Sequence, residues 1–169
     1  MDKQNSQEGT AAWILDFGPS HIALGEFEVL HILDQMPEKF PIPQSPPHCR
    51  EVILWEEQLV PLFDLNILVG GARPKRAGDE PAKQIVTIVA FHPSAGAIPQ
   101  YAALVLSKIP QRHTVQDMEA SALPQDTAAL DRFTQCAFLH PEFGQIRVLD
   151  LPRLFSAPAP IAHPSHKVQ

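Results

Sequence analysis

Hydrophobic and polar positions alternate over short stretches along most of the chain, which predicts many short strands. The clearest stretch is residues 51–65, E-V-I-L-W-E-E-Q-L-V-P-L-F-D-L, where two apolar runs flank Glu56-Glu57-Gln58. We interpret it as two strands joined by a tight polar turn. Pro61 lacks a backbone N–H, so we expect its strand at a sheet edge or a bulge. Asp64 is a good N-cap for a short helix that Gly70-Gly71 would end.

The N-terminal part predicts a hairpin followed by an irregular connection. Apolar residues in 13–17 and 21–24 flank a Gly18-Pro19-Ser20 turn. In residues 26–33 the apolar spacing suits one or two helical turns, and it suits an irregular strand equally well. Residues 36–49 contain five prolines, which favours an ordered but irregular connection.

The second half predicts two further strands and a repeated closing unit. Residues 84–91 and 98–109 hold strands that are apolar on both faces, which is typical of strands covered on both sides. Residues 70–83 form the internal loop that we expect to be most mobile, and residues 111–135 are polar, with a short helix near 115–122. Residues 136–149 predict a last hairpin, after which Asp150 caps a helical turn that extends to residue 155. This unit repeats the strand, Asp-Leu and helix of residues 60–65, and so suggests two similar halves.

The stretch 51–65 resembles the signature of the CheW-like domain, the adapter of bacterial chemosensory arrays, whose usual form is approximately G-V-I-N-x-R-G-x-x-V-P-V-x-D-L. The matching residues are Val52, Ile53, Val60, Pro61, Asp64 and Leu65. The family's Arg-Gly is replaced by Glu56-Glu57, and its leading Gly by Glu51. The resemblance covers roughly residues 13–155. It implies a mainly β fold of two packed five-stranded β-barrel subdomains with short helices.

The polar residues 1–12 and the Pro- and His-containing residues 156–169 are expected to be a disordered arm and a disordered tail around a domain of residues 13–155. A chain of 169 residues with 44% hydrophobic residues suffices for one such domain. Its eighteen prolines disfavour long helices.

Charge and composition exclude several classes of function. Thirteen Lys and Arg against nineteen Asp and Glu give a net charge of −6, which argues against nucleic-acid binding. The sequence contains no apolar run long enough to span a membrane and no secretory leader, so we expect a cytoplasmic protein without membrane insertion. Cys49 and Cys136 do not form a disulfide framework, and we expect reduced, partly buried thiols.

Catalytic and metal chemistry have little support in the sequence. Eight histidines are present, but their spacing lacks the pattern of a metal site, and His48-Cys49 is better explained by a buried or rim thiol than by a thiol-imidazole pair. Phosphate-binding loops and nucleophile elbows are absent. Carboxylates on the Glu56-Glu57 turn would be fully solvated, so we do not expect them to have the raised pKa values that acid–base catalysis needs. We therefore expect no enzyme activity, no metal and no cofactor.

The family resemblance makes the same turn a candidate contact surface. In the family, the turn that carries Arg-Gly lies at the surface that meets signalling partners, and Glu56 takes the place of its Arg, with Glu57 beside it. A carboxylate in place of a cation inverts the local potential. Either the partner carries a complementary basic patch, or the contact has been lost. His31 occupies a place where relatives often present an acidic residue, and both an interface role and no special role fit it.

The leading hypothesis is a non-catalytic adapter that couples the cytoplasmic tip of a methyl-accepting chemoreceptor to the regulatory domain of a CheA-type histidine kinase, in a flagellar or pilus-linked pathway. A groove between the barrels, lined by Val, Ile and Leu, would accept receptor helices, and the barrel end near Glu56 would dock on the kinase. Residues expected in the core rather than the groove are Val52, Leu54, Val60 and Leu62. The alternatives are a diverged CheW-like protein that activates no kinase, and a small β-barrel enzyme or ligand-binding protein that uses the inter-barrel cleft.

Overall fold

The computed structural model describes residues 9–71, 84–123 and 128–156. Strand β1 begins at Thr10, so the expected disordered arm of residues 1–12 is wrong at its C-terminal end, where Thr10 and Ala12 pair within a sheet. Ser156, placed in the expected tail, is the last residue of helix α3. The rest of the arm and tail, and most of the predicted mobile loop of residues 70–83, lie outside the described residues.

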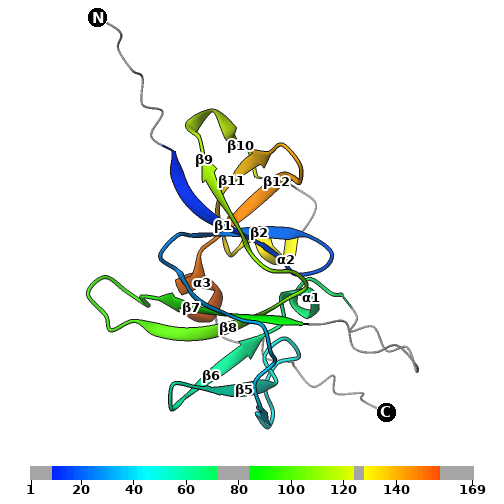
Figure 1. Cartoon of the computed structure of the whole chain (residues 1–169), viewed down its shortest axis with the longest axis vertical. Helices are drawn as coiled ribbons and strands as arrows, with labels where there is room; N and C mark the ends of the chain where they lie inside the picture. Colours follow the sequence, from blue (N-terminus) through cyan, green and yellow to red (C-terminus); the bar gives the residue numbers. More distant parts are fainter. Residues whose placement is uncertain (1–8, 72–83, 124–127, 157–169) are drawn as a thin grey trace, which may run out of the picture.

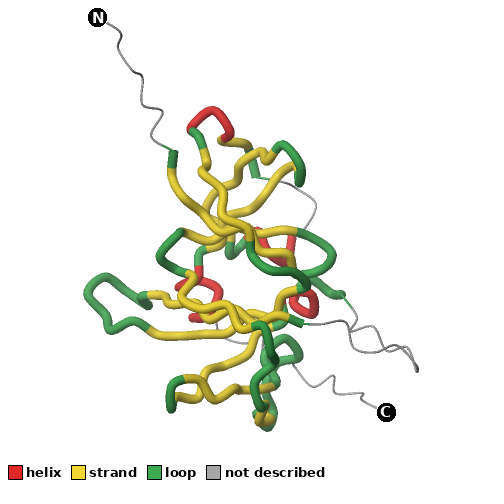
Figure 2. The backbone as a smooth tube through the Cα atoms, in the orientation of Figure 1, coloured by secondary structure: helices red, strands yellow, loops and turns green. Residues whose placement is uncertain are grey.

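Two six-stranded sheets form the framework of the described chain (Figures 1 and 2). Sheet A contains β1 (Thr10–Asp16), β2 (His21–Gly25), β9 (Gln111–Val115), β10 (Ala120–Ser121), β11 (Thr134–His140) and β12 (Gly144–Leu149). Sheet B contains β3 (Val29–Leu33), β4 (Lys39–Pro41), β5 (Glu51–Trp55), β6 (Gln58–Phe63), β7 (Ile85–Phe91) and β8 (Gln100–Leu106). The helices are α1 (Leu65–Leu68), η1 (Asp117–Glu119), α2 (Ala128–Asp131) and α3 (Leu151–Ser156). The predicted pair of packed β-subdomains with short helices is confirmed, and each sheet has six strands rather than five because the very short β4 and β10 are added.

The two sheets share one topology. The strand order is β10-β11-β12-β2-β1-β9 in sheet A and β4-β5-β6-β8-β7-β3 in sheet B, each with one parallel contact, β12 with β2 and β6 with β8. In both, the strand before the parallel contact runs into a short helix, α3 after β12 and α1 after β6. The repetition between the central and closing units is therefore structural. Sheet A combines the N-terminal hairpin β1–β2 with strands from the C-terminal half.

Each sheet curls until its two edges approach one another. In sheet A the edge strands β9 and β10 are separated by residues 116–119 alone, and His113 of β9 stacks 5.8 Å from Phe138 of β11. In sheet B the edges β3 and β4 are separated by residues 34–38, and His31 of β3 lies 5.5 Å from Trp55 of β5. Such short connections cannot span an open sheet of six strands, since one residue covers at most about 3.6 Å.

Strand alternation divides the apolar residues among three cores. In β7, Val86 and Ile88 enter the interior of sheet B, while Ile85 and Val89 face a core shared by the two subdomains. The interior of sheet A is small and contains Ile14, Ala23, Phe138 and Ile146. The shared core is the largest, with sixteen of the described buried residues against seven and four in the other two. The predicted burial of both faces is thus confirmed for β7, and likewise for β8.

Local signals at the ends of elements behave largely as predicted. Asp64 caps α1 through a hydrogen bond that its Oδ1 accepts from the backbone N–H of Ile67 at 3.3 Å, and Gly70 follows with a φ of +85°. Residues 26–33 resolve into strand β3 rather than a helix. The expected helix at residues 115–122 is limited to η1, and β9 is a strand that the polar sequence did not predict. Within the described residues, no helix has the length and apolar character needed to cross a membrane.

The expectation that Pro61 marks an edge strand or a bulge is wrong. Strand β6 lies between β5 and β8, and Pro61 pairs with Val52 of β5. On the other side, β8 pairs only with Leu62 and Phe63. The missing N–H is tolerated in an inner strand because the ladder with β8 starts one residue after the proline.

Candidate protein-interaction surface

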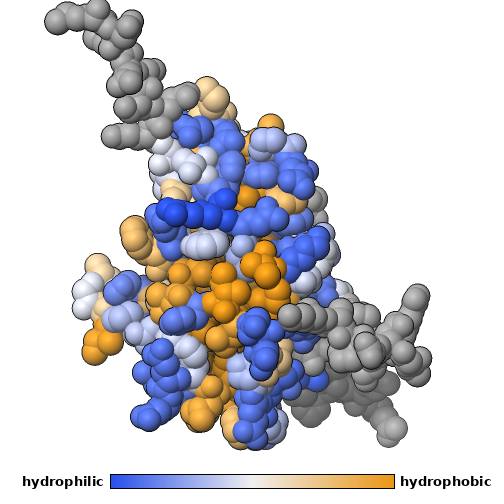
Figure 3. All heavy atoms as spheres, viewed as in Figure 1, coloured by the Kyte–Doolittle hydropathy of each residue, from blue (hydrophilic) through white to orange (hydrophobic). Residues whose placement is uncertain are grey.

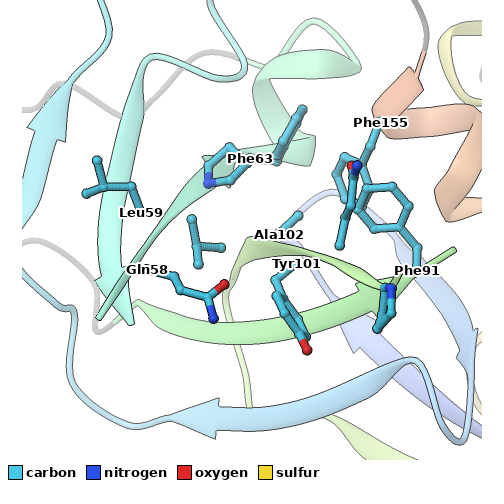
Figure 4. A pocket seen from close by; sticks show the side chains of 11 residues that line it. Gln58, Leu59, Phe63, Phe91, Tyr101, Ala102 and Phe155 are labelled. Carbon is cyan, nitrogen blue, oxygen red and sulfur yellow. The ribbon is translucent and has the colours of Figure 1, made fainter. Parts of the chain in front are cut away.

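A groove of about 370 Å³ lies on the outer face of sheet B, beside helix α3 (Figure 4). Its lining residues are Gln58, Leu59, Val60, Pro61, Phe63, Phe91, Pro99, Gln100, Tyr101, Ala102 and Phe155. Phe155 and Phe91 stand together at one end, and Leu59 lies at the other. The floor is therefore formed by β6, β7 and β8, and one wall by α3.

Both subdomains contribute to this groove. Helix α3 follows the last strand of sheet A and is capped by Asp150, whose Oδ1 accepts a hydrogen bond from the backbone N–H of Arg153 at 3.0 Å. It places the ring of Phe155 4.6 Å from Phe63 and 4.8 Å from Phe91, both on sheet B. In Figure 3, hydrophobic residues gather in the middle of the face in view, below a hydrophilic band, and continue downward between two hydrophilic groups.

The chemistry of the groove suits recognition rather than catalysis. The residues that line it include no Asp, Glu, His, Lys, Arg or Cys, and its polar side chains are Gln58, Gln100 and Tyr101. A general acid–base pair or a nucleophile with its activating base needs such groups within hydrogen-bond reach. The expected lining of Val, Ile and Leu is replaced largely by aromatic residues, which are enriched at protein interfaces.

The apolar surface continues from the groove along the β5–β6 hairpin. Leu54 pairs with Leu59, and the two are 54% and 66% exposed. The expected core position of Leu54 is thus wrong, and Val52 is only partly buried, because Ile53 is the β5 residue that fills the interior of sheet B. Val60 and Leu62 are buried as predicted. The exposed leucine pair forms an apolar patch directly beside the turn.

The turn itself, Glu56 and Glu57, is called the acidic tip below. It joins the paired residues Trp55 and Gln58, and its two residues have φ values of +46° and +63°. Two consecutive positive φ values are the signature of a type I′ turn, which fits the twist of a hairpin and usually contains Asn-Gly. An L-residue in this region costs roughly 1–2 kcal/mol. The acidic tip is exposed and holds its carboxylates in a strained backbone.

His31 and Glu56, two of the three predicted contact residues, are brought together. His31 Nε2 lies 3.9 Å from Glu56 Oε1, and both side chains are exposed. The backbone carbonyl of His31 is held by a hydrogen bond from the Thr87 hydroxyl at 3.0 Å. Glu57, the third, shares the turn. Trp55 connects this corner to the groove, because its ring lies 5.5 Å from His31 and 5.5 Å from Tyr101.

Among the described residues, three histidines cluster on sheet A, where their rings pack against one another and against Phe143. Phe143 is stacked between His21 and His140 at 4.2 Å and 4.7 Å, and His113 packs on the edge of His140. His140 Nδ1 accepts the backbone N–H groups of Glu142 and Phe143 at 3.1 Å and 3.3 Å. Burial, together with the charge of His113, lowers the pKa of His140. No group of three potential metal ligands occurs among the described residues.

The two cysteines are free, and neither is hydrogen-bonded to a histidine among the described residues. Cys49 is buried, and burial raises the pKa of its thiol, which disfavours the reactive thiolate. Its neighbour His48 has a pKa lowered by burial and then by Arg132, and its ring faces Phe63 at 6.0 Å. Cys136 is exposed.

Comparisons with known proteins agree with this architecture. The family model of the CheW-like domain matches residues 13–159. Among solved structures, the scaffolding protein TtCheW from Thermoanaerobacter tengcongensis matches with a TM-score of 0.66 and 16% identity, covering 88% of this chain and 94% of that chain. An identity this low shows a shared fold alone. Among curated proteins, no sequence match is found.

Proposed function

The chain belongs to the CheW-like domain family, and from this premise we propose that it is a non-catalytic cytoplasmic adapter that couples the tip of a methyl-accepting chemoreceptor to the regulatory domain of a CheA-type histidine kinase. The observation that carries the proposal is the groove, which is apolar, open and formed by both subdomains. An adapter binds its partners through surfaces that are complementary to theirs. The groove supplies an apolar surface for such binding.

The groove fits an amphipathic helix of the receptor tip. Helix-in-groove recognition places apolar side chains of the helix, spaced three or four residues apart, into a hydrophobic cleft. Phe63 and Phe91 provide an aromatic floor and Phe155 an aromatic wall, while Gln58 and Gln100 provide hydrogen-bonding groups at the rim. Contacts of this kind are reversible, as signalling requires, because much of the surface remains polar.

The kinase is assigned to the other exposed region, the β5–β6 hairpin. The acidic tip closes this hairpin at the end of sheet B, away from α3 along β6, whereas Leu59 lines the groove that is assigned to the receptor. Two partners that bind adjacent surfaces of one rigid domain are held at a fixed distance, which is the physical basis of an adapter. The residues assigned to this contact are Glu56, Glu57 and His31.

Binding to purified fragments from the same organism tests the proposal. We expect the full-length chain to bind the kinase regulatory domain and the receptor cytoplasmic fragment in calorimetric titrations. Leu59→Asp should weaken receptor binding at least tenfold, since an exposed leucine buried in an interface contributes about 1.5–3 kcal/mol. Leu139→Asp is the matched control, because Leu139 is 55% exposed on the equivalent hairpin of sheet A.

Two outcomes would contradict the adapter function. Absence of binding to both fragments by the wild-type chain excludes it. A tight small-molecule ligand found in a thermal-shift screen, together with that absence, would instead support a ligand-binding protein. An equal loss of receptor affinity in Leu59→Asp and Leu139→Asp would remove the groove as the receptor site.

A further inference from the structure

The interior of sheet A is incompletely filled at one end. Among the described residues its buried cluster has four members, whereas the interior of sheet B has seven. A cavity of about 310 Å³ lies at the end of sheet A that carries η1, at the top of Figure 1. Phe138 belongs both to the buried cluster and to the lining of this cavity. The cavity therefore continues the interior of sheet A towards solvent.

Small residues keep this space open. Ala12 of β1 lines the cavity and is paired with Gly25 of β2, which lines it as well. On β10, Ala120 adds a third small residue. Val115 and Val148 pack against the buried cluster but are only partly buried, since the cavity lies beside them. The space thus follows from the size of the side chains, because the pairing of β1 with β2 is regular at this point.

The lining is apolar in its depth and polar at its mouth. The lining residues are Thr10, Ala11, Ala12, Leu24, Gly25, Val115, Gln116, Asp117, Ala120, Cys136, Ala137, Phe138 and Val148. Phe138 and Leu24 are fully or almost fully buried, whereas Thr10 and Asp117 are exposed. Asp117 is the only charged residue of this lining, so a ligand anion would find no cation there.

From the unfilled interior, the apolar lining and the polar mouth, we propose that this cavity binds a small, neutral, mainly apolar molecule of the size of a bicyclic aromatic ring system with one amide or hydroxyl group. The volume is at the lower end of the range of about 300–1,000 Å³ for small-molecule sites, and the mouth of a β-barrel is one of their usual places. The apolar body of the molecule contacts Phe138 and Leu24, and its polar group meets Thr10 or Gln116 at the mouth.

This site is separate from the groove and does not depend on the adapter function. The groove lies on the outer face of sheet B, and no residue lines both. The buried cluster around Phe138 closes the inner end of the cavity, which suits a molecule that enters end-on rather than a helix laid along the surface. Leu24 also belongs to the shared core, so a bound molecule stabilises the whole domain and should raise its melting temperature.

Cys136 provides a reporter for occupancy of the cavity. It lines the cavity and is exposed, whereas Cys49 is buried and burial raises the pKa of its thiol. Iodoacetamide should therefore alkylate Cys136 much faster than Cys49 in the full-length chain. The probe is 1-naphthylacetamide. At about ten times its dissociation constant it should slow alkylation of Cys136 roughly tenfold, since only the empty form reacts.

Amide chemical shifts in two-dimensional NMR spectra locate the probe. We expect saturable shifts on β1, β9 and β11, with a dissociation constant of about 1 mM or lower for a molecule of this size. Ala120→Phe places a ring in the mouth and should weaken binding about tenfold or more. Met118→Phe is the matched control and should leave the affinity unchanged, because Met118 is 77% exposed and lies outside the lining. The anion 1-naphthylacetate should bind about tenfold more weakly than the amide or worse, because its carboxylate loses hydration without a cationic partner.

Three outcomes would overturn the inference. The first is the absence of saturable shifts with 1-naphthylacetamide at about 5 mM, well above the expected dissociation constant. The second is a set of shifts that maps to the groove instead of sheet A. The third is equal affinity of the wild type and Ala120→Phe, with unprotected Cys136. None of these results alters the binding of receptor or kinase fragments, which the titrations above measure separately.

Discussion

Glu57 occupies a backbone conformation that glycine adopts at much lower cost. Its φ is +63° in the middle of an exposed turn. We predict that Glu57→Gly raises the free energy of unfolding by about 1 kcal/mol, because the left-handed strain is removed. For a domain of this size that corresponds to a melting temperature roughly 2–4 °C higher, which calorimetry can measure.

The control for this prediction is Glu142→Gly. Glu142 is also an exposed turn residue, but it is not among the residues with positive φ. Added glycine there increases the entropy of the unfolded chain without relieving strain, so we expect lower stability. If both glycine variants shifted stability in the same direction, strain at the acidic tip would not be the cause.

His140 makes the hairpin β11–β12 sensitive to acid. Its Nδ1 accepts two backbone N–H groups, a role that a proton on this atom would abolish. Burial and the charge of His113 lower its pKa, an effect opposed by Glu142 and Glu119 and reinforced by His21. The unfolded chain therefore binds this proton more readily than the folded one, and stability is lost as pH falls below about 6.5, the unperturbed value.

We predict that the free energy of unfolding declines between pH 7.5 and 5.5 and that His140→Asn reduces this decline. The asparagine Oδ1 can accept the same N–H groups but does not titrate. The decline should shrink rather than vanish, because burial also lowers the pKa of His48. Urea titrations at several pH values provide the measurement. An unchanged pH slope in His140→Asn would show that this imidazole is not the responsible group.

The two short helices α1 and α3 begin at aspartates in different surroundings. Asp64 is 7% exposed and caps α1, whereas Asp150 is only partly buried. Burial raises the pKa of Glu28, and the charge of Asp150 raises it further. We predict that Asp64→Ala lowers the free energy of unfolding by about 1 kcal/mol or somewhat more. Asp150→Ala should cost less, since it also removes a like charge from Glu28.

Urea denaturation of the two alanine variants tests this order. Equal losses of unfolding free energy in the two variants would mean that neither the burial of Asp64 nor the charge of Glu28 affects what the cap contributes. A larger loss for Asp150→Ala would contradict the predicted order. Asp64 lies between β6 and α1, and Asp150 lies between β12 and α3. The difference between the two losses of unfolding free energy therefore also measures how similar these two strand–helix units are in energy.

Elements with a local sequence signal were predictable from the sequence. The β5–β6 hairpin and the caps Asp64 and Asp150 depend on residues close together in the chain, and so does the turn at Gly18, whose φ is +111°. Strand β9 has no such signal, since its polar residues are held by pairing with β1. The inner position of Pro61 likewise depends on where β8 starts to pair, which no local pattern shows.

The candidate site was predictable to the same extent. Glu56, Glu57 and His31 were identified through the family resemblance, and the structure places His31 beside Glu56. The aromatic lining of the groove was not predictable from the sequence, because Phe155 and Phe63 are distant in sequence and meet only when α3 packs on sheet B. The exposure of Leu54 was missed for a simpler reason. A continuous apolar run does not reveal which of its two alternating faces is the interior.

At the scale of the whole molecule, the subdomains are not independent units. Hairpin β1–β2 completes the sheet formed by the C-terminal strands, and β7–β8 completes the sheet formed by the preceding strands. The shared core then buries residues from both sheets and from α1, α2 and α3. Each fully buried leucine or isoleucine contributes about 1.5–3 kcal/mol, so the sixteen buried residues between the sheets supply most of the apolar stabilisation.

This architecture predicts that no part of the chain folds alone. Fragments of residues 1–71 and 84–169 each contain incomplete versions of both sheets, and we expect each to lack a cooperative unfolding transition in circular dichroism. A fragment of residues 26–109 is the sharper test, because it contains every strand of sheet B. It would still expose the faces of Val89, Phe91 and Leu104 that belong to the shared core, and such a surface favours aggregation and dye binding over a unique fold. If this fragment unfolded cooperatively with the stability of the intact chain, the interior of sheet B would suffice, and the shared core would not be what holds the two halves together.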